Sequence, residues 1–175
     1  MISILLPSRK RLTKLTRCIR SIADTASSKD NFEVCLRIHR DDVETIAALP
    51  DLLKICTVRV VIGLQHNGYN SLHWFYQEAA AIARGDWVWV MNDDVVCRTY
   101  DWDKLIPENI INAILMPERF GNGGSMYEQC GTTPFMFVPN KSWVKCGRPE
   151  FVAQFDASLW TLLREHGYET RFIPM

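Results

Sequence analysis

Short apolar runs alternate with amphipathic stretches through the first half of the 175-residue chain. Four runs have the composition of strands: residues 2–6, 32–38, 58–63 and 87–91. Between them, three stretches place apolar residues at helical spacing: residues 11–26, 43–54 and 71–84. Ser71 is expected to cap the third helix, and Gly85 to end it. This β-α-β-α-β-α-β order predicts an α/β fold, in which a mostly parallel central sheet has helices on both faces.

The second half is less regular, and it completes a chain long enough for a single domain. Residues 99–105 and 108–115 suggest a short helix or turn and then a connecting piece. Four glycines between 119 and 131 predict a loop. We expect a strand at 134–138, a helix at 156–166 and a closing strand at 169–173. In that last helix Asp156 is the expected N-cap and Gly167 the residue that ends it.

Charge and cysteine content narrow the class of protein. Lys and Arg (20) balance Asp and Glu (20), which argues against a nucleic-acid partner. No apolar run approaches the roughly 20 residues of a membrane span, and residues 2–6 are too short for a signal peptide. The six cysteines form no C-x-x-C pair, so we expect buried, reduced thiols and a cytoplasmic location, although a Cys130–Cys146 disulfide stays open. The sequence does not indicate an oligomeric state.

Polar residues follow each of the four predicted strands. They are Pro7 to Arg11, then His39 to Asp42, then Gly63 with Gly68 and Tyr69, and last Asn92 to Asp94. The carboxyl ends of parallel strands meet at one edge of the sheet, where such folds bind their ligands. The sequence therefore predicts a binding site at this edge, in which Tyr69 can stack on a base or a sugar.

The chemistry of these groups fits a metal-bound diphosphate. Carboxylates such as Asp93 and Asp94 are the ligands that Mg²⁺ or Mn²⁺ prefers when it also binds phosphate. Arg9 and Arg11 can bind phosphate oxygens through charge-assisted hydrogen bonds. Cations before a helix are unfavourable unless an anion lies there. The simpler alternative is structural: Asp residues in these loops cap turns or helices, and the basic residues are a solvated first turn.

The order of these motifs resembles family 2 glycosyltransferases of the GT-A fold. Matching elements are ILLPSRKR, FEVCLRIHRDD, GDWVWVMNDDV and FDASLWTLLREHGY, which together span most of the chain. The resemblance implies a single GT-A-like (Rossmann-like) domain over residues 1–175, with a nucleotide-sugar-binding half at 1–98 and an acceptor or catalytic half at 99–175. It also implies metal-assisted sugar transfer from a nucleotide-sugar, with UDP the expected nucleotide, to a glycan, lipid-linked or protein acceptor.

The same resemblance assigns roles to individual residues. Asp94 would be the principal metal ligand, with Asn92 where the first acid of an Asp-x-Asp motif would stand, and Asp93 would contact the donor sugar or ribose. Asp156 would be the general base of an inverting displacement. The nucleoside would be bound by Asp41 or Asp42, with Pro7, Ser8 and Arg9 alongside.

Two departures keep other functions open. Asn92 is neutral, and Phe155 stands where an acid usually precedes the base. A non-catalytic nucleotide-sugar or glycan-binding module is therefore one alternative. A sugar nucleotidyltransferase is another, but those enzymes carry a glycine-rich loop after the first strand, and this chain has no glycine before Gly63.

Overall fold

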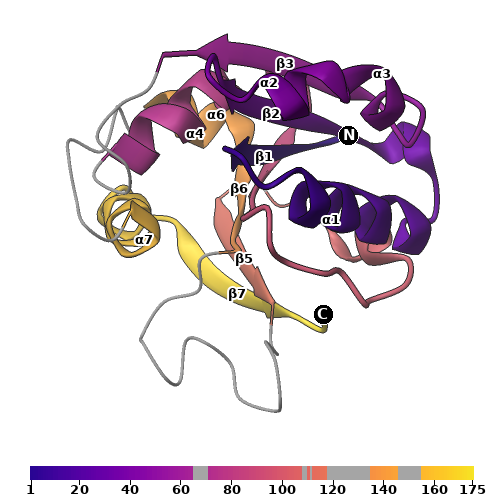
Figure 1. Cartoon of the computed structure of the whole chain (residues 1–175). Helices are drawn as coiled ribbons and strands as arrows, with labels where there is room; N and C mark the ends of the chain where they lie inside the picture. Colours follow the sequence, from indigo (N-terminus) through magenta and orange to yellow (C-terminus); the bar gives the residue numbers. More distant parts are fainter. Residues whose placement is uncertain (65–70, 108–109, 111, 118–134, 146–154) are drawn as a thin grey trace.

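The computed structural model describes residues 1–64, 71–107, 110, 112–117, 135–145 and 155–175, with the backbone alone at 144, 145 and 155–157. Its centre is a seven-stranded sheet in the order β3-β2-β1-β4-β6-β5-β7 (Figure 1). The strands are β1 Ile2–Ser8, β2 Phe32–His39, β3 Val58–Gly63, β4 Trp87–Val90, β5 Ala113–Pro117, β6 Phe137–Pro139 and β7 Glu169–Ile173. Only β6 runs antiparallel to its neighbours, β4 and β5, so the sheet is mostly parallel, as predicted.

Helices cover both faces of this sheet, which confirms the predicted fold class. They are α1 Leu12–Thr25, α2 Val43–Ala47, α3 Leu49–Leu52, α4 Leu72–Ala80, α6 Asn140–Lys145 and α7 Phe155–Glu165, with 3-10 turns η1 Lys29–Asn31 and η3 Trp102–Leu105. One buried cluster joins α1, α3 and η3 to the sheet. A second cluster joins α4, α6 and α7 to it.

Strand β1 shows why the sheet needs two helical layers. Ile2, Ile4 and Leu6 belong to the α1 cluster, whereas Leu5 belongs to the α4 cluster, and all four are buried. Because side chains alternate along a strand, apolar residues in succession require an apolar cover on both faces. β1 is therefore an interior strand covered on both faces, and the chain leaves it at the site described below.

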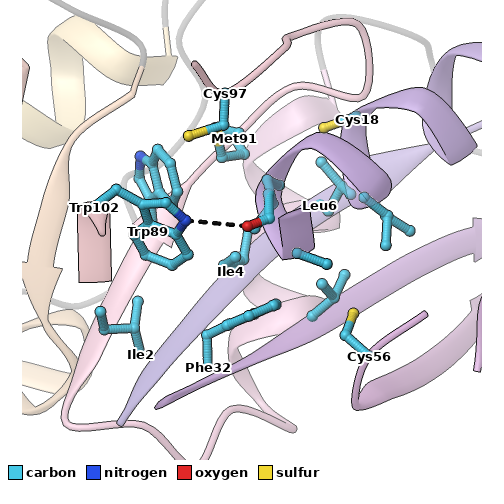
Figure 2. Close-up of a cluster of buried hydrophobic side chains, with 14 of the residues drawn as sticks. Ile2, Ile4, Leu6, Cys18, Phe32, Cys56, Trp89, Met91, Cys97 and Trp102 are labelled. Carbon is cyan, nitrogen blue, oxygen red and sulfur yellow. Dashed lines mark hydrogen bonds between the residues drawn. The ribbon is translucent and has the colours of Figure 1, made fainter. Parts of the chain in front are cut away.

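Aromatic rings fill the α1 side of the core (Figure 2). Trp89 of β4 stacks on Phe137 of β6 with ring centroids 4.4 Å apart. Trp102 is fully buried, and its Nε1 donates a 3.1 Å hydrogen bond to the Ile22 carbonyl of α1. A buried indole needs such a partner, so this bond fixes η3 against α1.

Several predicted boundaries need correction. The segment expected to be a connecting piece contains β5, whose five residues are all buried. The helix expected at 71–84 ends at Ala80, and Ser71 stands at its N-cap without a side-chain cap bond. The helix expected at 43–54 divides into α2 and α3 at Ala48, because Pro50 has no N–H with which to continue the first helix.

Two glycines at element boundaries are needed for different reasons. Gly167 ends α7 with φ +83°, and the Tyr168 N–H donates to the Leu163 carbonyl at 3.0 Å, as expected for a glycine-terminated helix. Gly85 does not end a helix: a Cβ there would lie 2.6 Å from the Ser3 backbone nitrogen and 2.7 Å from the Met1 carbonyl oxygen. Gly85 is therefore needed because the chain passes against the start of β1 before it enters β4.

The described cysteines fit the expectation of buried thiols. Cys18, Cys35, Cys56 and Cys97 are free and buried. Burial raises the pKa of both Cys18 and Cys35 to about 12. Cys130 and Cys146 lie outside the described residues. Across the part of the chain that is described, none of the helices combines the length and apolar character that a membrane crossing requires.

Candidate functional site

A cavity of ≈ 240 Å³ opens at the carboxyl ends of β1, β2 and β4, beside the first turns of α4. This is the edge at which the sequence placed a ligand, and β1 lies between the other two strands. The lining residues are Pro7, Ser8, Arg9, Arg11, His39, Leu72, Phe75, Asn92, Asp93 and Asp94. Seven predicted site residues thus meet in one cavity, although they come from segments more than eighty positions apart.

Asp41 and Asp42 do not line this cavity, and both bind the turn that follows β1. The Asp41 carboxylate accepts two hydrogen bonds from Arg9, at 2.7 and 3.3 Å, and pairs with Lys10 at 3.0 Å. Asp42 accepts from the Lys10 N–H at 2.6 Å and caps α2 by accepting from the Thr45 N–H at 3.2 Å. Hydrogen bonds from Arg9 and then Lys10 hold the pKa of Asp41 well below its usual range. In this structure, Asp41 and Asp42 therefore hold the turn between β1 and α1 in shape.

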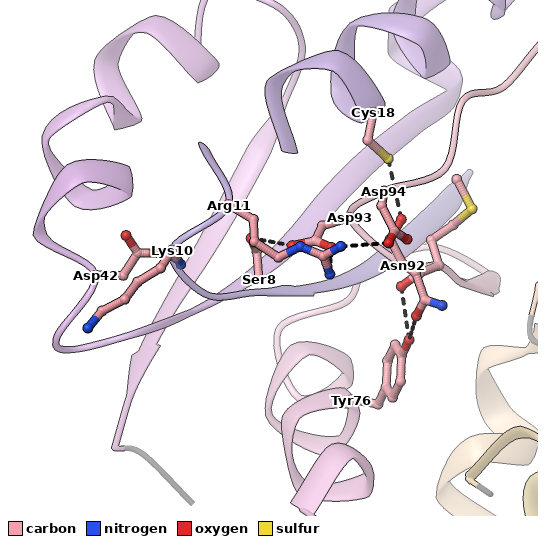
Figure 3. Close-up of polar contacts among 10 residues, drawn as sticks. Ser8, Lys10, Arg11, Cys18, Asp42, Tyr76, Asn92, Asp93 and Asp94 are labelled. Carbon is pink, nitrogen blue, oxygen red and sulfur yellow. Dashed lines mark hydrogen bonds and ion pairs between the residues drawn. The ribbon is translucent and has the colours of Figure 1, made fainter. Parts of the chain in front are cut away.

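Asp93 is the buried carboxylate of the cavity. It is 3% exposed and accepts a 2.7 Å hydrogen bond from the Ser8 hydroxyl, and one of its oxygens lies 2.8 Å from a nitrogen of Arg11 (Figure 3). Burial raises the pKa of Asp93, while the Ser8 hydrogen bond and the Arg11 charge act in the opposite direction. Asp93 therefore ties the end of β4 to the end of β1.

Asp94 is more open, and it shares the same cation. Its carboxylate lies 2.6 Å from a second nitrogen of Arg11, and its side chain is 42% exposed. Arg11 is the N-cap residue of α1, whose first turn contains no acid and has no side-chain cap. The anions near this helix end are thus the carboxylates of the neighbouring strands. These carboxylates supply the negative charge that basic residues at a helix N-terminus require, for which the sequence suggested a phosphate.

Asn92 is held from the opposite side of the cavity by α4. The Tyr76 hydroxyl lies 3.0 Å from the Asn92 side-chain oxygen and 2.9 Å from the Met91 carbonyl, and the tyrosine ring is 2% exposed. Figure 3 shows the phenol beneath the segment that carries Asn92. Since the hydroxyl has a single hydrogen to donate to two acceptors, it anchors this segment as a whole. Sequence reasoning missed Tyr76, which it placed on no particular face of the helix.

The end of the cavity beneath α4 is more apolar. Pro7, Leu72 and Phe75 line it together with His39, whose ring packs edge-on against Phe75 at 4.8 Å between centroids. The buried Arg37 guanidinium lies 4.2 Å from the centroid of the Phe75 ring. The sequence assigned Leu72 and Phe75 to the core face of a helix. Their three-residue spacing at the start of that helix was the signal that could have placed them beside the strand ends.

A divalent cation fits the acidic end of this cavity only in partnership with a ligand. Within the described ranges, no group of three or more His, Cys, Asp or Glu side chains is arranged to hold a metal. The protein offers the Asp94 carboxylate and the amide oxygen of Asn92, which are hard donors of the type that Mg²⁺ and Mn²⁺ accept along with phosphate oxygens and water. The Arg11 guanidinium between Asp93 and Asp94 shows that this pair does receive a cation.

Two predicted site residues and the side chain of a third lie outside what the structure describes. Gly68 and Tyr69 belong to the undescribed range 65–70. Asp156 lies in the first turn of α7, which begins one residue earlier at Phe155, so Asp156 is inside the helix and does not precede it as an N-cap. Only the backbone is described there, and the proposed base stays a prediction.

Comparison with known proteins identifies a sequence family and the fold. The sequence profile of glycosyl transferase family 2 matches residues 3–124, which run from the second residue of β1 past the end of β5 and include every lining residue of the cavity. No curated protein sequence matches the chain.

Solved structures share the fold at low sequence identity. TarS of S. aureus superposes with a TM-score of 0.74 at 14% identity, and the match covers 99% of this chain and 35% of that one. Its residues 1–349 in complex with UDP-GlcNAc give a TM-score of 0.71 at 15% identity, with coverages of 99% and 55%. The mannosyltransferase PcManGT of Pyrobaculum calidifontis, in complex with GDP-Man and Mn²⁺, gives 0.77 at 13% identity, with 99% and 54% covered. The chain thus spans roughly a third to just over half of the length of these proteins.

Proposed function

Since the chain belongs to glycosyl transferase family 2, we propose that it transfers a sugar, most simply a hexose, from a nucleotide-sugar to an acceptor hydroxyl. The observation that carries this proposal is the cavity lined by Arg9, Arg11, Asp93 and Asp94 at the carboxyl edge of parallel strands. Cations and carboxylates within one small cavity are what a metal-bound diphosphate requires.

The cavity suggests how a nucleotide-sugar would lie. Its diphosphate would meet Arg9 and Arg11 at the end of β1, and its base would extend toward Pro7, His39 and Phe75 under α4. Ligand sites for small molecules occupy about 300–1,000 Å³, so a cavity of ≈ 240 Å³ accommodates part of such a ligand. Ser8 and Asp93 would lie near the ribose or the donor sugar, while Asp41 and Asp42 would act by holding Arg9 and the Lys10 backbone in place.

Mn²⁺ or Mg²⁺ would be held by Asp94, with Asn92 as a neutral oxygen ligand. Such a cation neutralises charge on a leaving diphosphate. The protein's own contribution is positional. Arg9 and Arg11 orient the phosphates, and Ser8 keeps the buried Asp93 in place.

Asp156 is the base that we propose for the transfer. Its carboxylate would take the proton from the acceptor hydroxyl as that oxygen attacks the anomeric carbon, and the bond from this carbon to the diphosphate would break on the opposite side. The sugar would therefore be transferred with inversion. The acceptor class, whether glycan, lipid-linked or protein, would be determined by residues 99–175, and donor binding by residues 1–98.

Two further parts of the proposal concern the donor and the compartment. UDP and GDP complexes are both present among the structural neighbours, and we propose UDP as the nucleotide, with a metal as in the mannosyltransferase complex. Four free, buried thiols support the prediction of a reducing, cytoplasmic location.

The test is a set of thermal shifts with UDP, GDP, dTDP and CMP, each with and without Mn²⁺. A ligand at a hundred times its dissociation constant adds about 2.7 kcal/mol to the free energy of unfolding. We expect one nucleotide to stabilise the protein in a Mn²⁺-dependent manner, and Asp94→Ala to lose that dependence.

The matched control is Asp51→Ala, which removes an exposed aspartate that also pairs with a basic side chain, at 2.6 Å, but lies in α3. It should keep the full shift. If no nucleotide stabilises the wild-type protein under either condition, the donor-site assignment is wrong.

A further inference from the structure

One guanidinium holds both carboxylates at the acidic end of the cavity. The nitrogens of Arg11 lie 2.8 Å from Asp93 and 2.6 Å from Asp94, from a side chain that is 37% exposed (Figure 3). Asp93 has a second partner in Ser8, whereas Asp94, which also lines the cavity, is 42% exposed. Adjacent carboxylates repel one another unless a cation lies between them, and in this structure that cation belongs to the protein.

A divalent cation bound by these carboxylates would compete with Arg11 for them. A metal at the Asp94 carboxylate would lie close to the guanidinium that contacts one of its oxygens at 2.6 Å, and the two cations would repel each other. A metal that arrives alone must therefore displace Arg11 from both of these ion pairs. A diphosphate that arrives with the metal offers Arg11 a new partner of the same geometry, since the guanidinium fork matches carboxylate and phosphate alike.

We propose that Arg11 is an exchangeable counter-ion, which leaves Asp93 and Asp94 for the diphosphate as the divalent cation takes its place. The inference rests on the proposed function, because it assumes a metal and a diphosphate in this cavity. The inference also predicts how the two ligands affect each other. Without nucleotide, Arg11 weakens binding of the metal, and a bound nucleotide relieves this effect because its diphosphate gives Arg11 another partner. Metal and nucleotide then bind cooperatively, and each raises the affinity of the other by the same factor.

Arg9 is the natural contrast, because it lines the same cavity but keeps a different partner. It pairs with Asp41 at 2.7 Å, and Asp41 does not line the cavity. Arg9 can therefore meet a phosphate without occupying a carboxylate that the metal needs. Loss of Arg9 should weaken nucleotide binding and leave the affinity for the metal alone unchanged.

The experiment measures Mn²⁺ binding by the electron paramagnetic resonance signal of the free ion, with and without UDP. The proteins are wild type, Arg11→Gln and Arg9→Gln, since glutamine keeps a polar side chain and removes the charge. We expect Arg11→Gln to bind Mn²⁺ alone at least about fivefold more tightly than wild type, and to show a smaller gain on addition of UDP. Arg9→Gln should show no gain in affinity for Mn²⁺ alone.

The site of the gain is checked in the double variant Arg11→Gln/Asp94→Ala, which should lose it. Unchanged or weaker binding of Mn²⁺ alone by Arg11→Gln would overturn the proposal, and so would absence of Mn²⁺ binding by both proteins. If Arg11→Gln fails to fold by circular dichroism, Arg11→Met, which also removes the charge, replaces it and the same comparison applies. Failure of the proposed function appears separately, as absence of nucleotide binding by wild type with or without Mn²⁺, and the comparison with Mn²⁺ alone does not depend on it.

Discussion

Side chains at the edge of the sheet are held by partners from other segments before any ligand arrives. Ser8 of β1 binds Asp93 after β4, and Tyr76 of α4 binds Asn92. Preorganised groups of this kind do not have to be ordered when a ligand binds. A residue that contacts no ligand can therefore change binding, if it holds one that does.

Tyr76→Phe tests this at a single hydroxyl. The ring is buried and would keep its packing, while Asn92 and the Met91 carbonyl would lose their hydrogen bond, at a cost of about 1 kcal/mol in the free energy of unfolding. We also expect the Mn²⁺-dependent part of the nucleotide thermal shift to decrease. Tyr100→Phe is the control, because Tyr100 is 79% exposed, and it should change neither quantity. An unaltered Mn²⁺ dependence in Tyr76→Phe would mean that Asn92 takes no part in metal binding.

Asp156→Asn separates an enzyme from a binding module. A neutral amide cannot take the acceptor proton, so we expect loss of sugar transfer with an unchanged nucleotide shift. Transfer is measured as nucleotide released from the donor, and Glu165→Gln, an exposed position at the far end of the same helix, is the control. Full activity in Asp156→Asn would assign the base to another residue, and absence of activity in the wild type would favour the non-catalytic module.

At the scale of helices and strands, the sequence predicted correctly the elements whose hydrophobic pattern is distinctive. The apolar run of β1, the strand composition of β2 and the helical spacing of α1 were read correctly, because all three are set by local burial. Strand β5 was missed because a five-residue apolar run is too short to show a periodicity that distinguishes a strand from a connecting segment. Its strand structure depends on pairing with β7, which lies near the end of the chain. The cavity was predicted from strand ends, whereas the double ion pair of Arg11 depends on side-chain positions that no pattern shows.

The sequence predicted a boundary at Gly85 but did not show why a glycine is needed there. A methyl group there would meet backbone atoms of Met1 and Ser3 at 2.6–2.7 Å, and backbone cannot yield as a flexible side chain can. We expect Gly85→Ala to lower the free energy of unfolding by about 3 kcal/mol, as overpacking against backbone does. The measurement is urea denaturation.

Gly167→Ala is the comparison, because that site has φ +83° and nothing within 4 Å of an added Cβ. Gly167→Ala should lower the free energy of unfolding by only about 1 kcal/mol, because alanine disfavours the left-handed conformation. Equal losses for the two variants would show that the packing of Gly85 against β1 is not tight.

On the scale of the whole molecule, the cavity is assembled by the order of the strands. Parallel β2, β1 and β4 lie side by side, so their carboxyl ends bring His39, Ser8 and Asp93 together, and α4 closes the side above β1 and β2. The site therefore depends on interactions that hold these strands in register at their other ends. One such interaction is centred on a buried glutamate.

Glu33 of β2 joins four segments at the end of the sheet opposite the cavity. It is 2% exposed, and it accepts hydrogen bonds of 2.7 Å each from the Ser3 hydroxyl of β1, the Arg84 N–H before β4 and the Arg59 side chain of β3. Burial alone would raise the pKa of Glu33, but these three donors outweigh it and lower the pKa below the ordinary value of 4.5. The folded protein therefore favours the ionised form.

This gives a pH dependence with a definite sign. A carboxyl group whose pKa is lower in the folded state contributes stability that is complete above its unfolded pKa, near 4.5, and is lost as the pH falls through its folded pKa. We expect Glu33→Gln to be less stable than wild type by about 2 kcal/mol at pH 7, because the bond to Arg59 loses its charge. The difference should narrow below pH 4.5 as wild-type Glu33 takes up its proton.

Urea denaturation of both proteins from pH 3 to pH 7 measures this difference in the free energy of unfolding. The control is Glu169→Gln, exposed on the edge strand β7, which is expected to differ little from wild type at any pH. A constant difference between wild type and Glu33→Gln would mean that Glu33 contributes through packing and not through its charge.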